Sequence, residues 1–291
     1  MEMSLRQAQA GDVPALLTLP GAPSAEELRE QLFDAARGHG ANTLVALEAG
    51  VPVGCAGWVE APPWCFGSPV LARDEAVARR LVEHVLEQAR AMGASRVRIG
   101  VTPGEPGKRA ALESAGFSPA LDFIWYARAL KSGEGRLAAL PWRRVPWNEL
   151  DIEQYVDAHN DTFDGIPNAP PVSREVMADE LAQARLDRQA TAAWSDEQGR
   201  YVAFVQVQRD TDQDGLYGII DAIGVRAALR GRGVARALLE DVMARVSGEV
   251  RQLRALIAST NLPSIALHTS CGFREKSRRT IFEREVAARS E

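Results

Sequence analysis

The sequence predicts an α/β protein built from two domains of similar size, each with a mixed sheet. Its 291 residues are about twice the ~140 residues of a common domain. Strand-like and helix-like patterns alternate along the chain, and the same order of elements occurs twice, about 150 residues apart. With 46% hydrophobic and 25% charged residues, the chain has enough apolar material for two cores.

In the first half, period-two apolar alternation predicts strands, as at Val97, Ile99 and Val101. Amphipathic spacing predicts a long helix from Asp74 to Met92, and the acid three places after Ser24 favours a capped helix start. The expected strands are 4–8, 43–48, 52–59, one ending at 70–71, 95–101, one opening at 116–117, and 123–129. The expected helices are 13–18, 24–37, 74–92 and 108–115.

The second half repeats this order after Lys131–Gly135, a run typical of a flexible linker. We therefore expect one domain over 1–130, a linker over 131–140 and a second domain over 141–291. The expected strands are 142–145, 191–195, 201–208, 217–225, 251–259, one opening at 272–273, and 280–286. The expected helices are 151–163, 173–185, one from about 234 to 246, and a short one after Asn261.

A glycine-rich turn follows the strand at 217–225 and reads Leu229-Arg-Gly-Arg-Gly-Val-Ala235. Backbone N–H groups converge in such a turn, and the helix N-terminus adds partial positive charge, so it suits phosphate or pyrophosphate. Gly231 and Gly233 let the backbone approach a ligand, and Arg230 and Arg232 add charge at the rim. The turn matches neither the P-loop nor the Rossmann pattern, and alone it also fits a plain strand-to-helix connection.

A second stretch, 258–273, places Asn261 at a strand end, His268 on a short helix and Gly272-Phe273 at the start of a strand. Together the two stretches resemble the GNAT superfamily of N-acetyltransferases. The first matches the family's [QR]-x-x-G-x-[GA] signature at Arg230, Gly233 and Ala235. The second matches N-x-x-(A/S)-x-x-(L/F)-Y-x-x-x-G-F, with His268 where the family usually has tyrosine. The resemblance covers residues 141–287, and the repeat indicates two tandem GNAT domains, an arrangement also seen in mycothiol synthase.

The resemblance implies coenzyme A as the cofactor and acetyl-CoA as the acetyl donor. The pyrophosphate would lie on the glycine turn, and the extended pantetheine arm would pair with the edge of the preceding strand. Gly224 is the expected place for that strand to splay or bulge. Asn261 either fixes the arm through its side-chain amide or caps the short helix. The expected cofactor-binding residues are Ile223, Gly224, Val225, Arg230, Gly231, Arg232, Gly233, Val234, Ala235 and Asn261.

Two residues are candidates for proton transfer. Asp221 lies in an apolar run four residues before Val225, where this superfamily often carries its general base; the alternative is a surface carboxylate paired with an arginine. His268 replaces the tyrosine that protonates the departing thiolate, and it would donate if protonated or act through a water. The alternative for His268 is a histidine packed on a helix face.

The first half lacks most of these groups. Arg73-Asp74-Glu75-Ala76 stands where the second half has its glycine turn, Glu105 corresponds to Asn261, and Leu112 corresponds to His268. Carboxylates repel phosphate oxygens, so we expect a non-catalytic first domain and one cofactor per chain.

Composition narrows the function further. A net charge of −5 and a pI of 5.6 argue against nucleic-acid binding. Cys55, Cys65 and Cys271 show no metal or disulfide spacing, and neither a signal pattern nor a membrane span is expected, so we expect a soluble cytoplasmic protein. The sequence thus favours an N-acetyltransferase acting on a small-molecule amine, with a protein N-terminus or lysine as the alternative acceptor. Acceptor contacts are expected from 151–185 and the loop 163–168 around Asp164. The alternative is a coenzyme A-binding regulatory or interaction protein without turnover.

Overall fold

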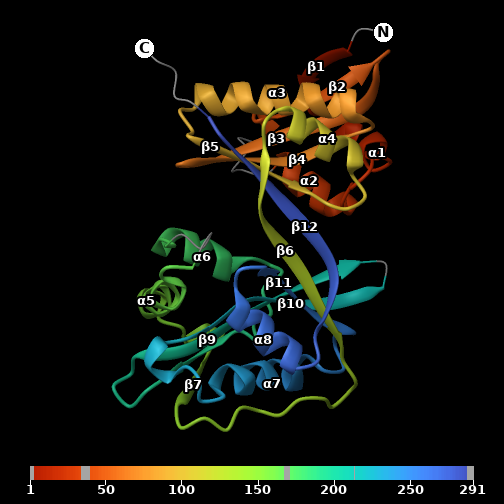
Figure 1. Ribbon diagram of the computed structural model, residues 1–291. Coiled ribbons are helices and arrows are strands. Elements are labelled where there is room, and N and C mark those ends of the chain that lie inside the picture. The colour runs from red at the N-terminus through yellow and green to blue at the C-terminus, as the bar shows by residue number, and fades with distance from the viewer. Residues whose placement is uncertain (1–2, 34–39, 167–170, 213, 287–291) are drawn as a thin grey trace. The chain divides into compact units, whose positions relative to one another are not determined.

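The computed structural model describes residues 3–33, 40–166, 171–212 and 214–286, and the chain forms two compact units. The first unit contains residues up to Phe123 together with those from Arg278 onward, and the second contains Ile124–Ser277. Both units are mixed α/β structures, as the sequence predicted (Figure 1). In the described part of the chain, no helix is both long and apolar enough to cross a membrane.

The first unit is a sheet with helices on both faces (Figure 1). Its strands are ordered β1-β2-β3-β4-β5-β12, and only β4 and β5 run parallel. Helix α3 packs on one face, and α1 and α2 pack on the other. The elements are β1 (Met3–Gln7), η1 (Ala10–Asp12), α1 (Val13–Leu16), α2 (Ala25–Phe33), β2 (Thr43–Glu48), β3 (Val51–Ala61), β4 (Trp64–Ala72), α3 (Glu75–Ala91), β5 (Arg96–Val101), α4 (Pro106–Ser114), the first part of β6 (Ser118–Ala129) and most of β12 (Arg274–Glu285). The predicted end of α2 near Arg37 lies outside the described residues.

The second unit repeats this plan. Its strands are ordered β7-β8-β9-β10-β11-β6, with β10 and β11 parallel and with antiparallel pairing from β7 through β10. The elements are β7 (Arg143–Pro146), η3 (Trp147–Glu149), α5 (Ile152–Phe163), α6 (Arg174–Ala182), β8 (Ala192–Ser195), β9 (Tyr201–Asp212), β10 (Gly215–Val225), η4 (Ala227–Leu229), α7 (Val234–Val246), β11 (Gln252–Ala258) and α8 (Leu262–Ser270).

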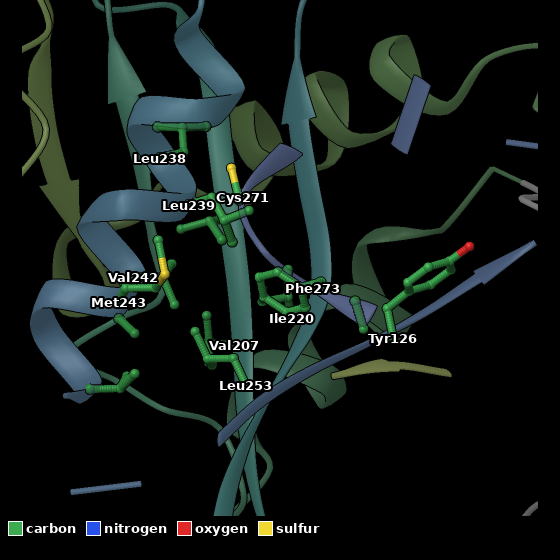
Figure 2. Packing of buried hydrophobic residues seen from close by; sticks show 14 of the residues in the cluster. Tyr126, Val207, Ile220, Leu238, Leu239, Val242, Met243, Leu253, Cys271 and Phe273 are labelled. Carbon is green, nitrogen blue, oxygen red and sulfur yellow. The ribbon is translucent and has the colours of Figure 1, made fainter. Parts of the chain in front are cut away.

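Two cores cover the two faces of the second sheet. On one face, Leu238, Leu239 and Val242 of α7 pack against Val207 and Ile220 of the sheet (Figure 2). On the other face, Tyr155 and Ala158 of α5 pack against Phe204. Successive strand residues point to opposite faces, so β9 sends Val205 and Val207 to α7, and Phe204 toward α5.

The division of the chain differs from the domain boundaries expected from sequence. Residues 280–285 of the last strand pair with β5 and complete the first sheet, whereas Ile124–Ala129 of β6 belongs to the second unit. The segment expected to be a linker is packed: Arg136 N–H donates to Glu240, and Ala138 N–H donates to Asp241 Oδ1 at 3.0 Å. Strand pairing between distant segments leaves no pattern in the local sequence. The linker-like composition at 131–135 therefore located the boundary between the two domains only roughly.

Candidate active site

The second sheet opens where β10 and β11 separate. The two strands pair only at Gly218–Leu253 and Ile219–Arg254, while β10 continues beside β9 as far as Val225. Beyond Ile219, therefore, β10 has a neighbouring strand on one side only among the residues that the structure describes. An extended ligand can add to such an edge as a further strand.

The orientation of the β10 backbone shows which groups face the opening. Arg226 N–H donates to Val202 O at 3.0 Å, so residue 226 points its polar groups toward β9. In an antiparallel pair this orientation alternates along the strand. Val225 and Ile223 therefore point their N–H and C=O groups away from β9, into the opening. These two residues were expected from sequence to hold the cofactor arm.

A β-bulge lies between Ile220 and Ala222, not at Gly224 where the sequence suggested one. The bulge brings Asp221 and Ala222 to the same face of the sheet, toward α5, because the extra residue interrupts the alternation. Gly224 is required for a different reason: a Cβ there would overlap the Phe204 ring and lie 2.9 Å from Thr162 Cγ2. Gly224 therefore marks the close approach of Phe204 and Thr162 to the strand, and the sequence-based prediction of a bulge at this residue was wrong.

Asp221 is held by two glutamine side chains from β9. Gln206 Nε2 and Gln208 Nε2 each donate to Asp221 Oδ2 at 3.1 Å. Gln206 is only 1% exposed, and its Oε1 faces the Tyr155 hydroxyl at 3.5 Å. The tyrosine therefore directs the Gln206 amide nitrogen toward the carboxylate. Asp221 is exposed, which agrees with one part of its sequence alternative, but among the described residues it forms no ion pair with an arginine.

A second carboxylate shares the same amide. Glu180 Oε2 of α6 lies 3.5 Å from Gln206 Nε2. Burial raises the pKa of Asp221, and the negative charge of Glu180 adds to this, against smaller opposing effects of Arg185 and His159. Asp221 is nevertheless exposed; both observations hold for a carboxylate that water reaches from one side while protein surrounds the rest. A raised pKa suits a group that must take up a proton near neutral pH.

The glycine loop connects β10 to α7 through residues 226–233. Gly231 and Gly233 have φ of +74° and +79°, which favour glycine, and an added Cβ at either would meet open space. Gly233 is the N-cap of the 13-residue α7, and no side chain caps that end. By contrast, Asp74, Asp151, Ser173 and Asn261 cap helices α3, α5, α6 and α8. The first N–H groups of α7, at Val234 and Ala235, are thus left for an anion.

The two loop arginines differ in orientation. Both are exposed. Arg230 also contacts the backbone: its Nε donates to Val225 O and its Nη2 donates to Thr162 O, both at 2.9 Å. Its guanidinium is thus anchored at the surface, and the charge of both arginines at the rim stays a prediction.

Asn261 has the capping role that the sequence left open. Its Oδ1 accepts from Ser264 N–H at 3.2 Å at the start of α8. The cap uses the oxygen of the amide, so the Nδ2 group remains the part with which it would bind a cofactor arm.

His268 is 1% exposed and lies edge-on to Phe273, with ring centroids 5.1 Å apart. Its Nδ1 lies 2.8 Å from Ser264 O, and a carbonyl only accepts, so Nδ1 carries a proton. Burial lowers the pKa of His268, which makes the neutral ring the form present near pH 7. Nε2 is then an acceptor, and it is buried without a hydrogen-bond partner among the described residues. This geometry favours the packed-histidine alternative over the proton donor.

The corresponding place in the first unit is closed. Only Arg73 and Asp74 separate β4 from α3, so the glycine loop is missing rather than substituted. Asp74 Oδ1 accepts from Val77 N–H at 3.0 Å and so occupies the helix N-terminus itself. Glu105 precedes α4 where Asn261 precedes α8, but its carboxylate accepts from Thr102 instead of capping the helix, and it forms a buried ion pair with Lys108. Lys108 Nζ also donates to Val70 O of β4 at 2.9 Å.

The sequence analysis missed several residues of the site. Gln206, Gln208, Tyr155 and Glu180 come from three elements and meet only in the folded chain. The alternating pattern of β9 could have shown that Gln206 and Gln208 share a face, since they are polar residues in a buried strand. The acceptor residue expected in the loop, Asp164, is exposed at the end of α5, and residues 167–168 of that loop lie outside the described part.

Comparisons with known proteins agree with this geometry. The structure resembles a GCN5-related N-acetyltransferase from Sphaerobacter thermophilus, with TM-score 0.77 and 20% identity over 98% of this chain and 96% of the other. It also resembles a tandem GNAT protein from the clavulanic acid biosynthesis pathway, with TM-score 0.71 and 18% identity over 99% and 100%. No curated protein matches the sequence. The sequence matches the Acetyltransferase (GNAT) family twice, over residues 13–117 and 152–273. The chain therefore belongs to the GNAT acetyltransferase family, with two such domains in tandem.

Proposed function

We propose that the second unit is an N-acetyltransferase that uses acetyl-CoA and acetylates the primary amine of a small molecule. The observation that supports this most is that an open strand edge at Ile223–Val225 is followed by a helix N-terminus that no side chain caps. An extended amide chain ending in a pyrophosphate needs both features at once. In the first unit the corresponding helix end, that of α3, is capped by Asp74 and the loop is missing, so we propose one cofactor per chain.

The cofactor-binding residues follow from this geometry. Gly231, Gly233 and the first N–H groups of α7 would hold the pyrophosphate, with Arg232 adding charge. Ile223 and the N–H of Val225 would pair with the amide arm, and Asn261 Nδ2 is placed on the neighbouring helix. Acetyl-CoA, when bound, supplies an acetyl group activated as a thioester.

Asp221 is the proposed general base. A primary amine arrives protonated, and only its neutral form attacks a carbonyl carbon. Asp221 takes up the proton on the carboxylate that Gln206 and Gln208 orient. Glu180 adds negative charge beside it, which raises the proton affinity of Asp221 and favours a cationic acceptor. We propose that His268 does not protonate the leaving thiolate. Its neutral ring carries no proton on Nε2, so this nitrogen can only accept a hydrogen bond.

Thiol release from acetyl-CoA tests this proposal with a panel of primary amines. Release that depends on the amine and falls in the Asp221→Asn variant supports it. Binding of coenzyme A without amine-dependent release from any member of a broad panel would favour the regulatory alternative. We also propose that the protein acts in the cytoplasm, where its free cysteines would stay reduced.

A further inference from the structure

Two arginines of the glycine loop are attached to α5, the helix on the acceptor face of the sheet. Arg226 donates from Nε to Tyr201 O at 2.7 Å, and its Nη1 lies 3.1 Å from Asp161 Oδ2. Its Nη2 forms a further ion pair with Asp157. The Arg226 side chain is only 12% exposed, so these contacts hold a largely buried guanidinium. Asp157 and Asp161 are one helical turn apart on α5.

Arg230 makes the second attachment. Its two donors at 2.9 Å reach Val225 O at the end of β10 and Thr162 O in the last turn of α5. Carbonyls in the last turn of a helix lack intrahelical partners, and a cation there also interacts favourably with the helix dipole. The guanidinium therefore satisfies two orphan carbonyls and ties the strand end to the helix end.

Helix α5 also faces the proposed acceptor site. Tyr155 reaches Gln206, and His159 packs against Phe204, 5.7 Å between ring centroids. The same helix is thus bound to the glycine loop by Asp157, Asp161 and Thr162. We propose that Arg226 and Arg230 are positioning residues that fix the glycine loop to α5. This inference rests on the proposed function only where it takes the loop to bind the cofactor and α5 to line the acceptor site.

The competing assignment for Arg230 is the one its sequence position suggested, a charge that contacts the cofactor phosphate. The two assignments predict different consequences. A positioning residue affects α5 even in the free protein, and its loss leaves the salt dependence of cofactor binding unchanged. A phosphate-contacting residue affects binding and its salt dependence, and leaves α5 unchanged. Arg232, exposed on the same loop, is the matched control.

Amide hydrogen exchange of the full chain without ligand tests the attachment directly. We expect exchange in the C-terminal half of α5 to speed up about tenfold or more in Arg226→Ala and Arg230→Ala, the scale expected from losing charge-assisted hydrogen bonds. Arg232→Ala should leave α5 unchanged. Arg230→Lys keeps the charge but loses the two-pronged geometry, so it should resemble Arg230→Ala while remaining folded.

Calorimetric titration with coenzyme A at two salt concentrations completes the test. Arg232→Ala should weaken binding and reduce its salt dependence, while Arg230→Ala should keep the salt dependence of the wild type. Unchanged amide exchange of α5 in both Arg226→Ala and Arg230→Ala would overturn the inference. So would an equal loss of the salt dependence of coenzyme A binding in Arg230→Ala and Arg232→Ala. If coenzyme A fails to bind the wild type, the proposed function fails, and the exchange measurement on the free protein still decides the attachment.

Discussion

Replacing Asp221 by asparagine isolates the charge of the proposed base from its geometry. Gln206 and Gln208 donate to the same oxygen, Oδ2, each at 3.1 Å. The carbonyl oxygen of asparagine can occupy that position and accept both bonds, with its amide nitrogen in place of Oδ1. The variant therefore keeps the arrangement of the site and loses only the negative charge and the ability to take up a proton.

General acid–base catalysis contributes roughly 10²–10⁴-fold, so kcat/KM should fall by about that factor, or about 3–5 kcal/mol of transition-state stabilisation. In the wild type, activity should decline as pH falls through the raised pKa of Asp221, since the protonated acid cannot accept a proton. That decline should be missing from the variant. Its deficit should shrink at high pH, where the amine loses its proton to solvent.

The same change should not weaken the fold. A carboxyl whose pKa is raised on folding stabilises the folded state at low pH, and this contribution is lost as pH rises through the raised pKa. At neutral pH the ionised Asp221 therefore disfavours folding, and the asparagine variant should unfold at the same temperature or higher. Thiol release from acetyl-CoA and thermal unfolding give the two measurements. Asp179→Asn, an exposed carboxylate on α6, is the control. Activity of Asp221→Asn within a few-fold of wild type, with a parallel pH profile, would refute the reasoning.

Further substitutions test Gly224 and Asn261 of the second unit and the buried Lys108–Glu105 pair of the first. Gly224→Ala forces a methyl group against Phe204 and should destabilise the protein by about 1–3 kcal/mol in denaturant unfolding, and a neutral result would remove the close-approach argument. Lys108→Met leaves Glu105 buried without its cation and should cost about 3–5 kcal/mol, with much of the loss recovered when Glu105→Gln is added; equal losses in the single and double variants would contradict the pairing. Asn261→Ala should cost about 1 kcal/mol through the lost cap, and Asn261→Asp should restore that stability, so a cofactor affinity that stays low in the aspartate variant would reveal the separate role of Nδ2.

The parts of the fold that depend on local pattern were predictable from the sequence. The long helix α3 and the strand–turn–helix around Gly233 follow from apolar spacing and from glycine placement. The absence of the phosphate loop in the first half was anticipated from Asp74 and Glu75, although the sequence suggested a substituted loop and the structure has a shorter one.

What escaped prediction depends on contacts between distant residues. The pairing of β12 with β5 joins segments almost 180 residues apart in sequence, and no local signal marks it. A glycine inside a strand can mark either a bulge or a close approach of another side chain. The strand register places the bulge at Asp221 and leaves the close approach as the reason for Gly224. The two backbone contacts of Arg230 depend on the position of α5, so its sequence motif could indicate the exposed charge but not these contacts.

Calorimetric titration with acetyl-CoA tests the central claim most directly, namely that the open N-terminus of α7 holds the cofactor and that the first unit holds none. Wild type should bind one acetyl-CoA per chain. Gly233→Asp should bind none, because a carboxylate at this N-cap repels the pyrophosphate, whereas Gly233→Asn, which carries the same backbone strain at φ +79° without the charge, should still bind. A stoichiometry of two, or an unchanged affinity in Gly233→Asp, would contradict the account.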